Sequence, residues 1–448
     1  MPLWVRTNRA AVATAQAVGA PPPIVFADIE MVGRNCHLSA YTKKTIGTVK
    51  VSDDIIAYSS PDSTFAVTKS LFDKATKSIL IGIYDFTAAH MRQLLLDAMA
   101  RGVKVSLMLD IDSKDETDLF DNLVQMGATG VSAPSCANKH VHYFASSHEK
   151  VICIDDELVL VQSGNYSDNS IPLNVVDGAD KKAYKTGNRD TGLAIRSAKL
   201  CKLFADILLS DMALVTATPQ MLEAPIEENA FLVEAAPTKV PSQLFPSQRF
   251  KLTTPLTITP VLSPDNYMDV VPGLLKKATS SILIEQQYIK ASQPNIQKLL
   301  EAMAAAKKKN PDLDIRIVLG KVFSAGDLPK ERANLELLAN TYGLELGTNI
   351  RYINTDQLVH CHNKMIVVDG NAVLVSSQNW SDFAVTKNRE AGVWLTHKGI
   401  AKYFGAIFEY DWKVGFKTPE KGVTHAASPE AVREGGFVRV VRADYEEV

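Results

Sequence analysis

An internal repeat constrains the fold of this chain more than any other feature of its sequence. The stretch SPDSTFAVTKSLFDKATKSILIGIYDF begins at Ser60, and SPDNYMDVVPGLLKKATSSILIEQQYI begins at Ser263. Each copy reads as a turn, an amphipathic helix and a β-rich strand, at residues 79–84 in the first copy and 282–288 in the second. Another helix pattern and another apolar strand follow in each copy. This alternation predicts an α/β protein in which helices cover the outside of a layered sheet in each half.

A proline-rich stretch separates the two copies, and 448 residues are enough for two large lobes. Prolines recur from residue 219 to residue 260, which predicts a connector with little regular structure. The first 23 residues end in PPP and are expected to form a frayed tail. Near the other end, FVRVVR is a candidate edge strand. We therefore divide the chain into an N-terminal extension (1–50), a first lobe (51–215), a connector (216–260), a second lobe (261–415) and a C-terminal tail (416–448).

The bulk composition is that of a soluble globular protein, with 46% hydrophobic and 22% charged residues. The formal net charge is −2 and the charges are interspersed, so no global field favours nucleic acid, although a local basic cleft stays open. No run approaches the roughly 18 apolar residues that cross a bilayer. The N-terminus also lacks the continuous apolar region of a secretory signal. We expect a cytoplasmic protein or one peripheral to a membrane, with secretion left open.

The chain has an odd number of cysteines and no close CxxC pair. We expect reduced thiols rather than a disulfide framework at Cys36, Cys136, Cys153, Cys201 and Cys361. Cys153 and Cys361 lie in or beside apolar strands, where packing is the expected role.

A histidine, a lysine two residues later and an aspartate five residues beyond it occur twice. HEKVICID begins at His148, and HNKMIVVD begins at His362. On a strand, alternate side chains share a face, so His148 and Lys150 point the same way, as do His362 and Lys364. One such motif is a weak signal, whereas two copies with matching surroundings indicate a shared chemical role.

Two further polar clusters follow each motif. SGNYSDNS places Ser163 and Asn165 just after a strand, and SSQNWSDF places Ser377 and Asn379 in the same way. Short hydroxyl and amide groups in this position can bind an anion together with the lysine. The third cluster reads GNRDTGLAI in the first half and KNREAGVWL in the second.

The carboxylates in these clusters have different expected roles. Asp155 and Asp369 close the two motifs, but strand alternation turns them away from the histidines, so we expect both to be structural. Asp190 and Glu390, in the third clusters, are our candidates for the carboxylate that fixes an imidazole tautomer and stabilises its charged form.

Two histidines and two lysines suit the cleavage of a phosphodiester. One neutral imidazole can attack phosphorus while the other, protonated, donates to the leaving alkoxide. Lys150 and Lys364 can neutralise the charge that develops on the phosphoryl oxygens. This chemistry requires neither a metal nor an organic cofactor. His360 and His140 also stand two residues before a histidine, but no further cluster of zinc ligands accompanies either pair, so we expect no metal.

These motifs resemble those of the phospholipase D superfamily, whose signature is H-x-K-x4-D followed by G/S-x-N and N-x-E elements. The resemblance covers both halves, from about Ser60 to Trp412. It implies two similar lobes, each a mixed β-sheet flanked by helices, packed about a pseudo-two-fold axis with both motifs in one cleft. It also implies a phosphohistidine intermediate, with His148 as the nucleophile and His362 as the general acid.

The chain departs from the superfamily pattern in three places. The first half has Asp190 where the pattern has a glutamate, and the second half reads Ser376-Ser377 where the pattern has a glycine. The first half also contains an inserted loop, IPLNVVDGADKKAYKTG. We expect this loop to border the cleft, and Lys181, Lys182 and Lys185 are candidates either for substrate contact or for a solvated surface.

We therefore expect a metal-independent phosphodiesterase of phospholipase D type that hydrolyses or transfers the phosphatidyl group of phospholipids. The alternatives are an endonuclease that cleaves DNA or RNA and a non-catalytic scaffold that binds phosphate. The missing basic stripe places phospholipid ahead of nucleic acid. With both motifs in one chain, we expect a monomer that needs no protein partner.

Overall fold

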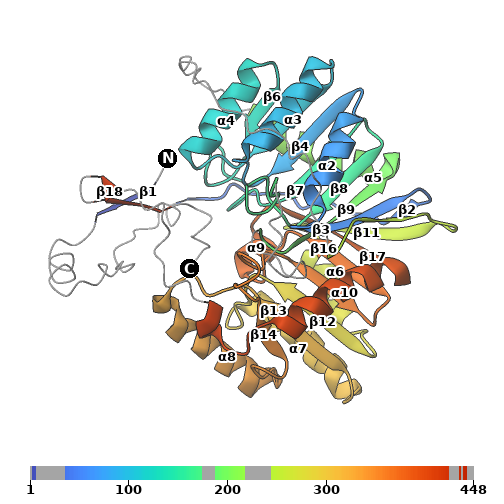
Figure 1. The fold of residues 1–448 in the computed structure, drawn as a ribbon, viewed down its shortest axis with the longest axis vertical. Helices are drawn as coiled ribbons and strands as arrows, with labels where there is room; N and C mark the ends of the chain where they lie inside the picture. The colour runs from blue at the N-terminus through green and yellow to red at the C-terminus, as the bar shows by residue number, and fades with distance from the viewer. Residues whose placement is uncertain are drawn as a thin grey trace.

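The computed structural model describes residues 3–6, 36–173, 187–216, 244–422, 433–434 and 437–440. The chain forms two lobes (Figure 1), the first coloured blue to green and the second yellow to red. Three predicted features lie outside the described residues: the proline-rich end of the N-terminal tail, the three lysines of the inserted loop, and the connector from residue 217 to residue 243.

The first lobe is built on an eight-stranded sheet with the order β10-β3-β9-β8-β7-β4-β5-β6. Its strands are β3 (Ile55–Ser60), β4 (Ser78–Ile83), β5 (Lys104–Leu109), β6 (Thr129–Ser132), β7 (Lys150–Ile154), β8 (Leu158–Gln162), β9 (Asp190–Arg196) and β10 (Gln248–Phe250). Its helices are α2 (Thr64–Asp73), α3 (Ala89–Ala100), α4 (Lys114–Gln125) and α5 (Ala198–Thr216). Strands β4, β5 and β6 are parallel, and the other pairs are antiparallel.

The second lobe repeats this plan in a sheet with the order β14-β13-β12-β15-β16-β17-β11-β2. Its strands are β2 (Val49–Val51), β11 (Leu256–Ser263), β12 (Ser281–Gln286), β13 (Asp314–Leu319), β14 (Ile350–Tyr352), β15 (Met365–Val368), β16 (Ala372–Ser376) and β17 (Glu390–Thr396). Its helices are α6 (Tyr267–Leu275), α7 (Pro294–Lys309), α8 (Leu328–Tyr342), α9 (Asp382–Thr386) and α10 (Lys398–Val414). The prediction of two similar lobes, each a mixed sheet flanked by helices, is confirmed.

The apolar residues form three core clusters that explain this arrangement. One lies between the first sheet and α2, α3 and α4, and a second lies between the other sheet and its helices. The third is shared by α5, α10 and the remaining faces of both sheets. Strands β7 and β8 are buried along their whole length, which is why they read as continuous apolar runs rather than alternating ones. The shared cluster joins the two lobes and fixes the interface between them.

Two short strands cross the boundaries expected from the sequence. Strand β2, in the expected N-terminal extension, pairs with β11 in the second sheet, and β10, in the expected connector, pairs with β3 in the first. The expectation that residues 216–260 hold little regular structure is therefore wrong for β10 and for the start of β11. These strands pair through their backbones with partners distant in the chain, so proline content did not predict them.

The terminal strand is also placed differently from the expectation. Phe437–Val440 forms β19, but it pairs with β1 (Leu3–Arg6) and β18 (Arg433–Glu434) in a separate three-stranded sheet. Figure 1 shows this sheet to one side of the two lobes. It does not extend either lobe sheet. Within the described parts of the chain, no helix is long and apolar enough to cross a membrane.

The expectation that all five cysteines are reduced is wrong for two of them. Cys36 and Cys136 form a disulfide across a sequence separation of 100 residues. The fold brings them together, and neither their count nor their spacing in the sequence reveals such proximity. Cys153, Cys201 and Cys361 are buried free thiols.

Candidate active site

The two motif histidines meet at the interface between the lobes. His148 lies just before β7 and His362 just before β15. Their ring centroids are 6.4 Å apart, and their side chains are 6% and 8% exposed. The fold thus brings both copies of the motif into one nearly buried site.

Each histidine is held by a carboxylate from the opposite lobe. Nδ1 of His148 lies 2.9 Å from Oε2 of Glu390, and Nδ1 of His362 lies 2.9 Å from Oδ1 of Asp190. These are the two carboxylates expected to fix an imidazole. An ionised carboxylate at Nδ1 acts as an acceptor, so it places the proton of a neutral ring on Nδ1 and the lone pair on Nε2.

Backbone hydrogen bonds hold each histidine next to the carboxylate of the opposite lobe. The amide of His148 donates to the carbonyl of Arg389 at 2.8 Å, and the amide of His362 donates to the carbonyl of Arg189 at 3.0 Å. Because each arginine directly precedes one of the carboxylates, the motif of one lobe is clamped against the third cluster of the other.

The cluster serines support the carboxylates. Ser163 Oγ donates to Oδ1 of Asp190 at 2.8 Å, and Ser377 Oγ donates to Oε2 of Glu390 at 2.5 Å. No pattern in the sequence predicted these two contacts. The expected contact of both serines with phosphate stays a prediction.

The two histidine–carboxylate pairs differ in their electrostatics. Burial raises the pKa of Glu390 to about 8, against the opposing effect of Lys150 and the serine hydrogen bond. Burial also acts to raise the pKa of Asp190, but His362 and Lys364 outweigh it and hold that pKa below its usual value. The pKa of His362 is itself lowered by burial and by Lys364. The lobes are therefore alike in geometry but unequal in proton affinity.

The motif lysines lie on the same side as the histidines. Each Nζ donates at 2.6 Å to the carbonyl of the histidine two residues earlier, and both side chains are fully buried. Tyr84 packs against the His148 ring with a centroid separation of 4.5 Å, and Lys150 Nζ lies 5.0 Å from the centroid of the same tyrosine ring. Gln287 takes the corresponding place in the second lobe and accepts from Lys364 Nζ at 3.2 Å. Neither Tyr84 nor Gln287 was expected, because the repeat places different residue types there.

The asparagines after each motif also lie in the buried site. Asn165 and Asn379 are 7% and 4% exposed. The side-chain oxygen of Asn165 accepts no hydrogen bond from the described residues. A buried amide in this state has hydrogen-bonding capacity left for a ligand. Phosphate binding by both asparagines stays a prediction.

Asp155 and Asp369 are turned away from the histidines and hold the beginnings of β4 and β12. The Asp155 carboxylate accepts from the backbone amides of residues 76, 77 and 78, and Asp369 accepts from those of residues 279, 280 and 281. These hydrogen bonds lower the pKa of both carboxyl groups despite partial burial, which opposes them. Their contacts are structural.

Two buried arginines were missed in the sequence. The Arg189 guanidinium pairs with Asp411 of α10 at 2.6 Å, and the Arg389 guanidinium pairs with Asp211 of α5 at 2.7 Å. Each arginine therefore joins its own lobe to the long helix of the other. The signal was present, because NRD and NRE recur in the third cluster of both halves.

The zinc interpretation of His360 can be compared with its surroundings. Among the side chains that the structure describes, no three or more His, Cys, Asp or Glu groups are arranged to hold a metal ion. His360 packs instead against Gly320, where a Cβ would lie only 2.2 Å from the imidazole. Its Nδ1 accepts from the backbone amide of Lys321 at 3.1 Å.

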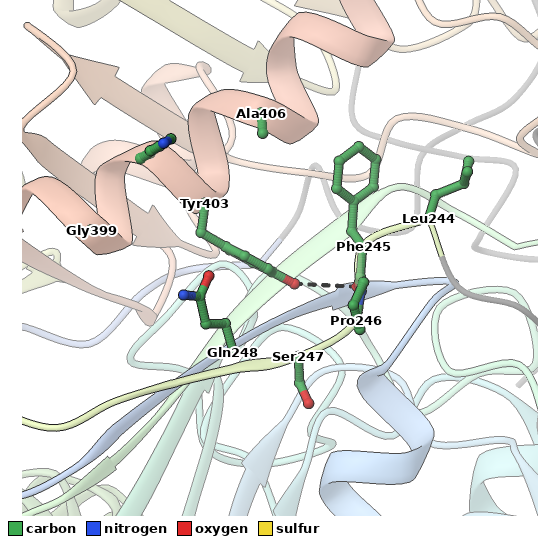
Figure 2. A pocket seen from close by; sticks show the side chains of 9 residues that line it. Leu244, Phe245, Pro246, Ser247, Gln248, Gly399, Tyr403 and Ala406 are labelled. Atoms are coloured by element: carbon green, nitrogen blue, oxygen red, sulfur yellow. Dashed lines mark hydrogen bonds between the residues drawn. The ribbon is translucent and has the colours of Figure 1, made fainter.

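A separate pocket of about 470 Å³ lies between residues 244–248 and helix α10. Figure 2 shows Tyr403 and Phe245 on facing sides of it, joined by a 3.4 Å hydrogen bond from the tyrosine hydroxyl to the phenylalanine carbonyl. None of the motif residues lines this pocket, so it is distinct from the histidine site.

Comparison with known proteins agrees with the fold and the motifs. The sequence family described as "Cardiolipin synthase, PLD-like domain" matches residues 68–212 and 272–412, more than half of the chain. No sequence among the curated proteins matches the chain.

Solved structures show the same relationship at low sequence identity. The phosphatidylserine synthase of Haemophilus influenzae Rd KW20 superposes with a TM-score of 0.57 at 14% identity, over 84% of this chain and 90% of that one. Nuc from Salmonella typhimurium, a phospholipase D family member, covers 36% of this chain and 94% of its own, with 21% identity and a TM-score of 0.29. The first of these likenesses establishes the two-lobe fold. With both motifs matched by the sequence family, the chain belongs to the phospholipase D superfamily, whose members are phosphodiesterases or transferases.

Proposed function

We propose that this protein is a metal-independent phosphodiesterase in which His148 and His362 divide nucleophilic and acid catalysis. The observation that carries the proposal is the 6.4 Å approach of the two rings, each held at Nδ1 by a carboxylate of the opposite lobe. A phosphorus atom between the two Nε2 atoms would meet an attacking lone pair on one side and a proton donor on the other.

The reaction proceeds in two balanced steps. In the first, Nε2 of one histidine bonds to phosphorus, the ester P–O bond breaks, and the leaving oxygen takes a proton from the other histidine. In the second, that histidine removes a proton from water or an alcohol, whose oxygen bonds to phosphorus while the P–N bond breaks. Lys150 and Lys364 stabilise the charge on the phosphoryl oxygens in both steps, as preorganised cations in a site with little water.

Two arguments bear on which histidine is the nucleophile, and they point in opposite directions. The superfamily resemblance implies that His148 attacks and that His362 donates, and we propose this order. The lowered pKa of His362 favours the reverse, because it makes His362 the more readily neutral imidazole. Binding of an anionic phosphate raises the pKa of a nearby imidazole, which would keep His362 protonated and able to donate a proton in the complex.

We propose a phospholipid as the substrate, with hydrolysis or transfer of its phosphatidyl group. The near-neutral net charge of −2 and the pairing of both motifs in one chain support a lipid over duplex DNA. A nuclease would instead lose affinity steeply as salt is raised, whereas a lipase would be stimulated by phospholipid vesicles. The same assay on vesicles and on DNA therefore separates the two substrates.

The test is release of p-nitrophenol from bis(p-nitrophenyl) phosphate in EDTA. Wild type should turn over, and His148→Ala and His362→Ala should each lose about 10³-fold or more in kcat. His140→Ala is the matched control, because His140 is exposed and its loss should leave kcat unchanged. Turnover that survives both motif substitutions would show that these histidines are not the catalytic residues, and no turnover in wild type would favour the phosphate-binding scaffold.

A further inference from the structure

Residues 36–51, which lead into the first lobe, tie the two lobes together; we name this segment the tether. At one end it is bonded covalently to the first lobe through the Cys36–Cys136 disulfide. Ser39 then donates its amide to the carbonyl of His142 at 2.7 Å. At its other end, β2 pairs with β11 of the second sheet. The tether is therefore fixed at both ends, across the interface that carries the histidines.

Tyr41 in the middle of the tether contacts the buried Arg389. Its hydroxyl accepts from Nη2 of Arg389 at 2.6 Å and donates to Oδ1 of Asp265 at 3.1 Å. The guanidinium also lies over two rings, 5.0 Å from the centroid of Tyr41 and 4.4 Å from that of Phe144. Asp211 and Asp265 supply the balancing charges. The hydroxyl completes a shell around a fully buried cation.

The backbone of Arg389 is in direct contact with the catalytic site. Its amide donates to the carbonyl of Ser146 at 2.8 Å, and its carbonyl accepts from the amide of His148 at 2.8 Å. The next residue is Glu390, which holds Nδ1 of the same histidine. A displacement of Arg389 would therefore move the His148 backbone and the carboxylate that orients its ring.

Arg189, the counterpart of Arg389, has a different aromatic neighbour. The ring of Phe245 lies beside it, with the guanidinium carbon 5.6 Å from the ring centroid, and Phe245 has no hydroxyl to offer. The part of the chain that carries Phe245 is held by hydrogen bonds from the amides of Leu244 and Phe245 to Asp62. The tether hydroxyl therefore belongs to the His148 side of the site.

We propose that Tyr41 is a positioning residue for His148, acting through Arg389, and that the Cys36–Cys136 disulfide keeps Tyr41 in place. The effect on catalysis rests on the proposed function, whereas the effect on the geometry of His148 does not. The disulfide therefore has a role in the active site as well as in stability.

The first experiment compares Tyr41→Phe with Lys44→Ala in turnover of bis(p-nitrophenyl) phosphate. Tyr41→Phe keeps the ring and removes only the hydroxyl, so kcat should fall about threefold to tenfold while KM stays within about twofold. Lys44→Ala is the control, because Lys44 lies on the same tether but its Nζ donates to Ser210 of α5. Its kcat should equal that of wild type.

A second measurement shows whether the effect passes through Glu390. The loss from Tyr41→Phe should largely vanish in a Glu390→Gln background, because both changes act on the same contact to His148. A tyrosine that only stabilised the fold would lower both backgrounds alike.

Reduction tests the role of the disulfide. A dithiol gives two electrons and two protons to the disulfide, which yields two cysteine thiols and the cyclic disulfide of the reagent. Reduced wild type should match Tyr41→Phe in kcat. The Cys36→Ser/Cys136→Ser variant should show the same low kcat with or without the dithiol.

The histidine ring can be observed without any turnover. In protein labelled with 15N-histidine, the ring signals of His148, assigned from His148→Ala, should shift in Tyr41→Phe and on reduction but not in Lys44→Ala. Unchanged His148 signals in Tyr41→Phe and in the reduced protein would overturn the inference. Inactive wild type with shifted signals would instead contradict the proposed function and leave the positioning role standing.

Discussion

Asp190 and Glu390 occupy equivalent places in the two lobes, but their surroundings move their pKa values in opposite directions. The shorter Asp190 still reaches His362 at 2.9 Å, so the departure from the superfamily pattern is accommodated without loss of the contact. The pKa of Asp190 is held below its usual value by His362 and Lys364, whereas burial raises the pKa of Glu390 to about 8. The two carboxyl groups that hold the histidines therefore differ in proton affinity.

The two lobes carry a buried carboxyl group at different positions of the repeat, and in the first lobe it is Glu149. A Cβ at Gly82 would lie 2.4 Å from Cδ2 of Leu208 and 3.0 Å from Oε1 of Glu149, so this glycine makes room for both side chains. In the second lobe Glu285 stands where Gly82 does, and Asn363 takes the place of Glu149 and donates to Glu285 at 2.8 Å. Each lobe thus buries one carboxyl group beside its motif. In the first lobe it comes from the residue before β7, and in the second it comes from β12.

These buried carboxyl groups predict a pH dependence of stability. Burial raises the pKa of Glu149 to about 8 from an ordinary value of 4.5. Between those values the folded protein keeps a proton that the unfolded chain releases, so the free energy of unfolding falls as pH rises. Glu149→Gln removes this group, so it should make the fall between about pH 5 and pH 8 less steep than in wild type. Urea titrations of both proteins across this range measure it, and equal slopes would contradict the shifted pKa of Glu149.

At the scale of the element, the motif aspartates hold strands rather than substrate. Asp155 accepts three backbone amides at the start of β4, the strand next to β7 that follows His148. We predict that Asp155→Ala lowers the free energy of unfolding by about 1–3 kcal/mol while kcat stays within about threefold of wild type. Urea unfolding and the p-nitrophenol assay measure the two quantities. Asp53→Ala, at an exposed position, is the control for stability. A stable variant without activity would give Asp155 a catalytic role instead.

Strand alternation is why much of the site could be predicted from the sequence. That His148 and Lys150 share a face, and that Asp155 does not, follows from a period of two residues and needs no knowledge of the fold. The pairing of His148 with Glu390 rather than with Asp190 depends on which backbone segments meet across the interface. Two halves that carry the same motifs contain no local signal that distinguishes these choices. The Cys36–Cys136 disulfide and the three-residue strands β2 and β10 could not be predicted either, because they too depend on which distant segments of the chain meet.

At the scale of the whole molecule, each lobe contributes side chains and a strand to the other. Helix α5 of the first lobe supplies Asp211 to Arg389, and helix α10 of the second supplies Asp411 to Arg189. Strand β2 directly precedes the first lobe in the sequence but lies in the second sheet. Strand β10 directly precedes the second lobe but lies in the first sheet. Neither lobe contains a complete histidine–carboxylate pair by itself. Separation of the lobes would therefore abolish both pairs at once.

The central claim is that one histidine of this joint site forms a covalent bond to phosphorus. The direct measurement is mass spectrometry of the protein quenched in alkaline denaturant during turnover of bis(p-nitrophenyl) phosphate. We predict a p-nitrophenylphosphoryl group on the peptide that contains His148. The adduct should accumulate in His362→Ala, because p-nitrophenolate leaves without an acid but water then lacks a base to activate it. No adduct should form in His148→Ala. Modification of His362 with His148 unmodified would reverse the assigned roles, and turnover with no histidine adduct in any variant would contradict the account.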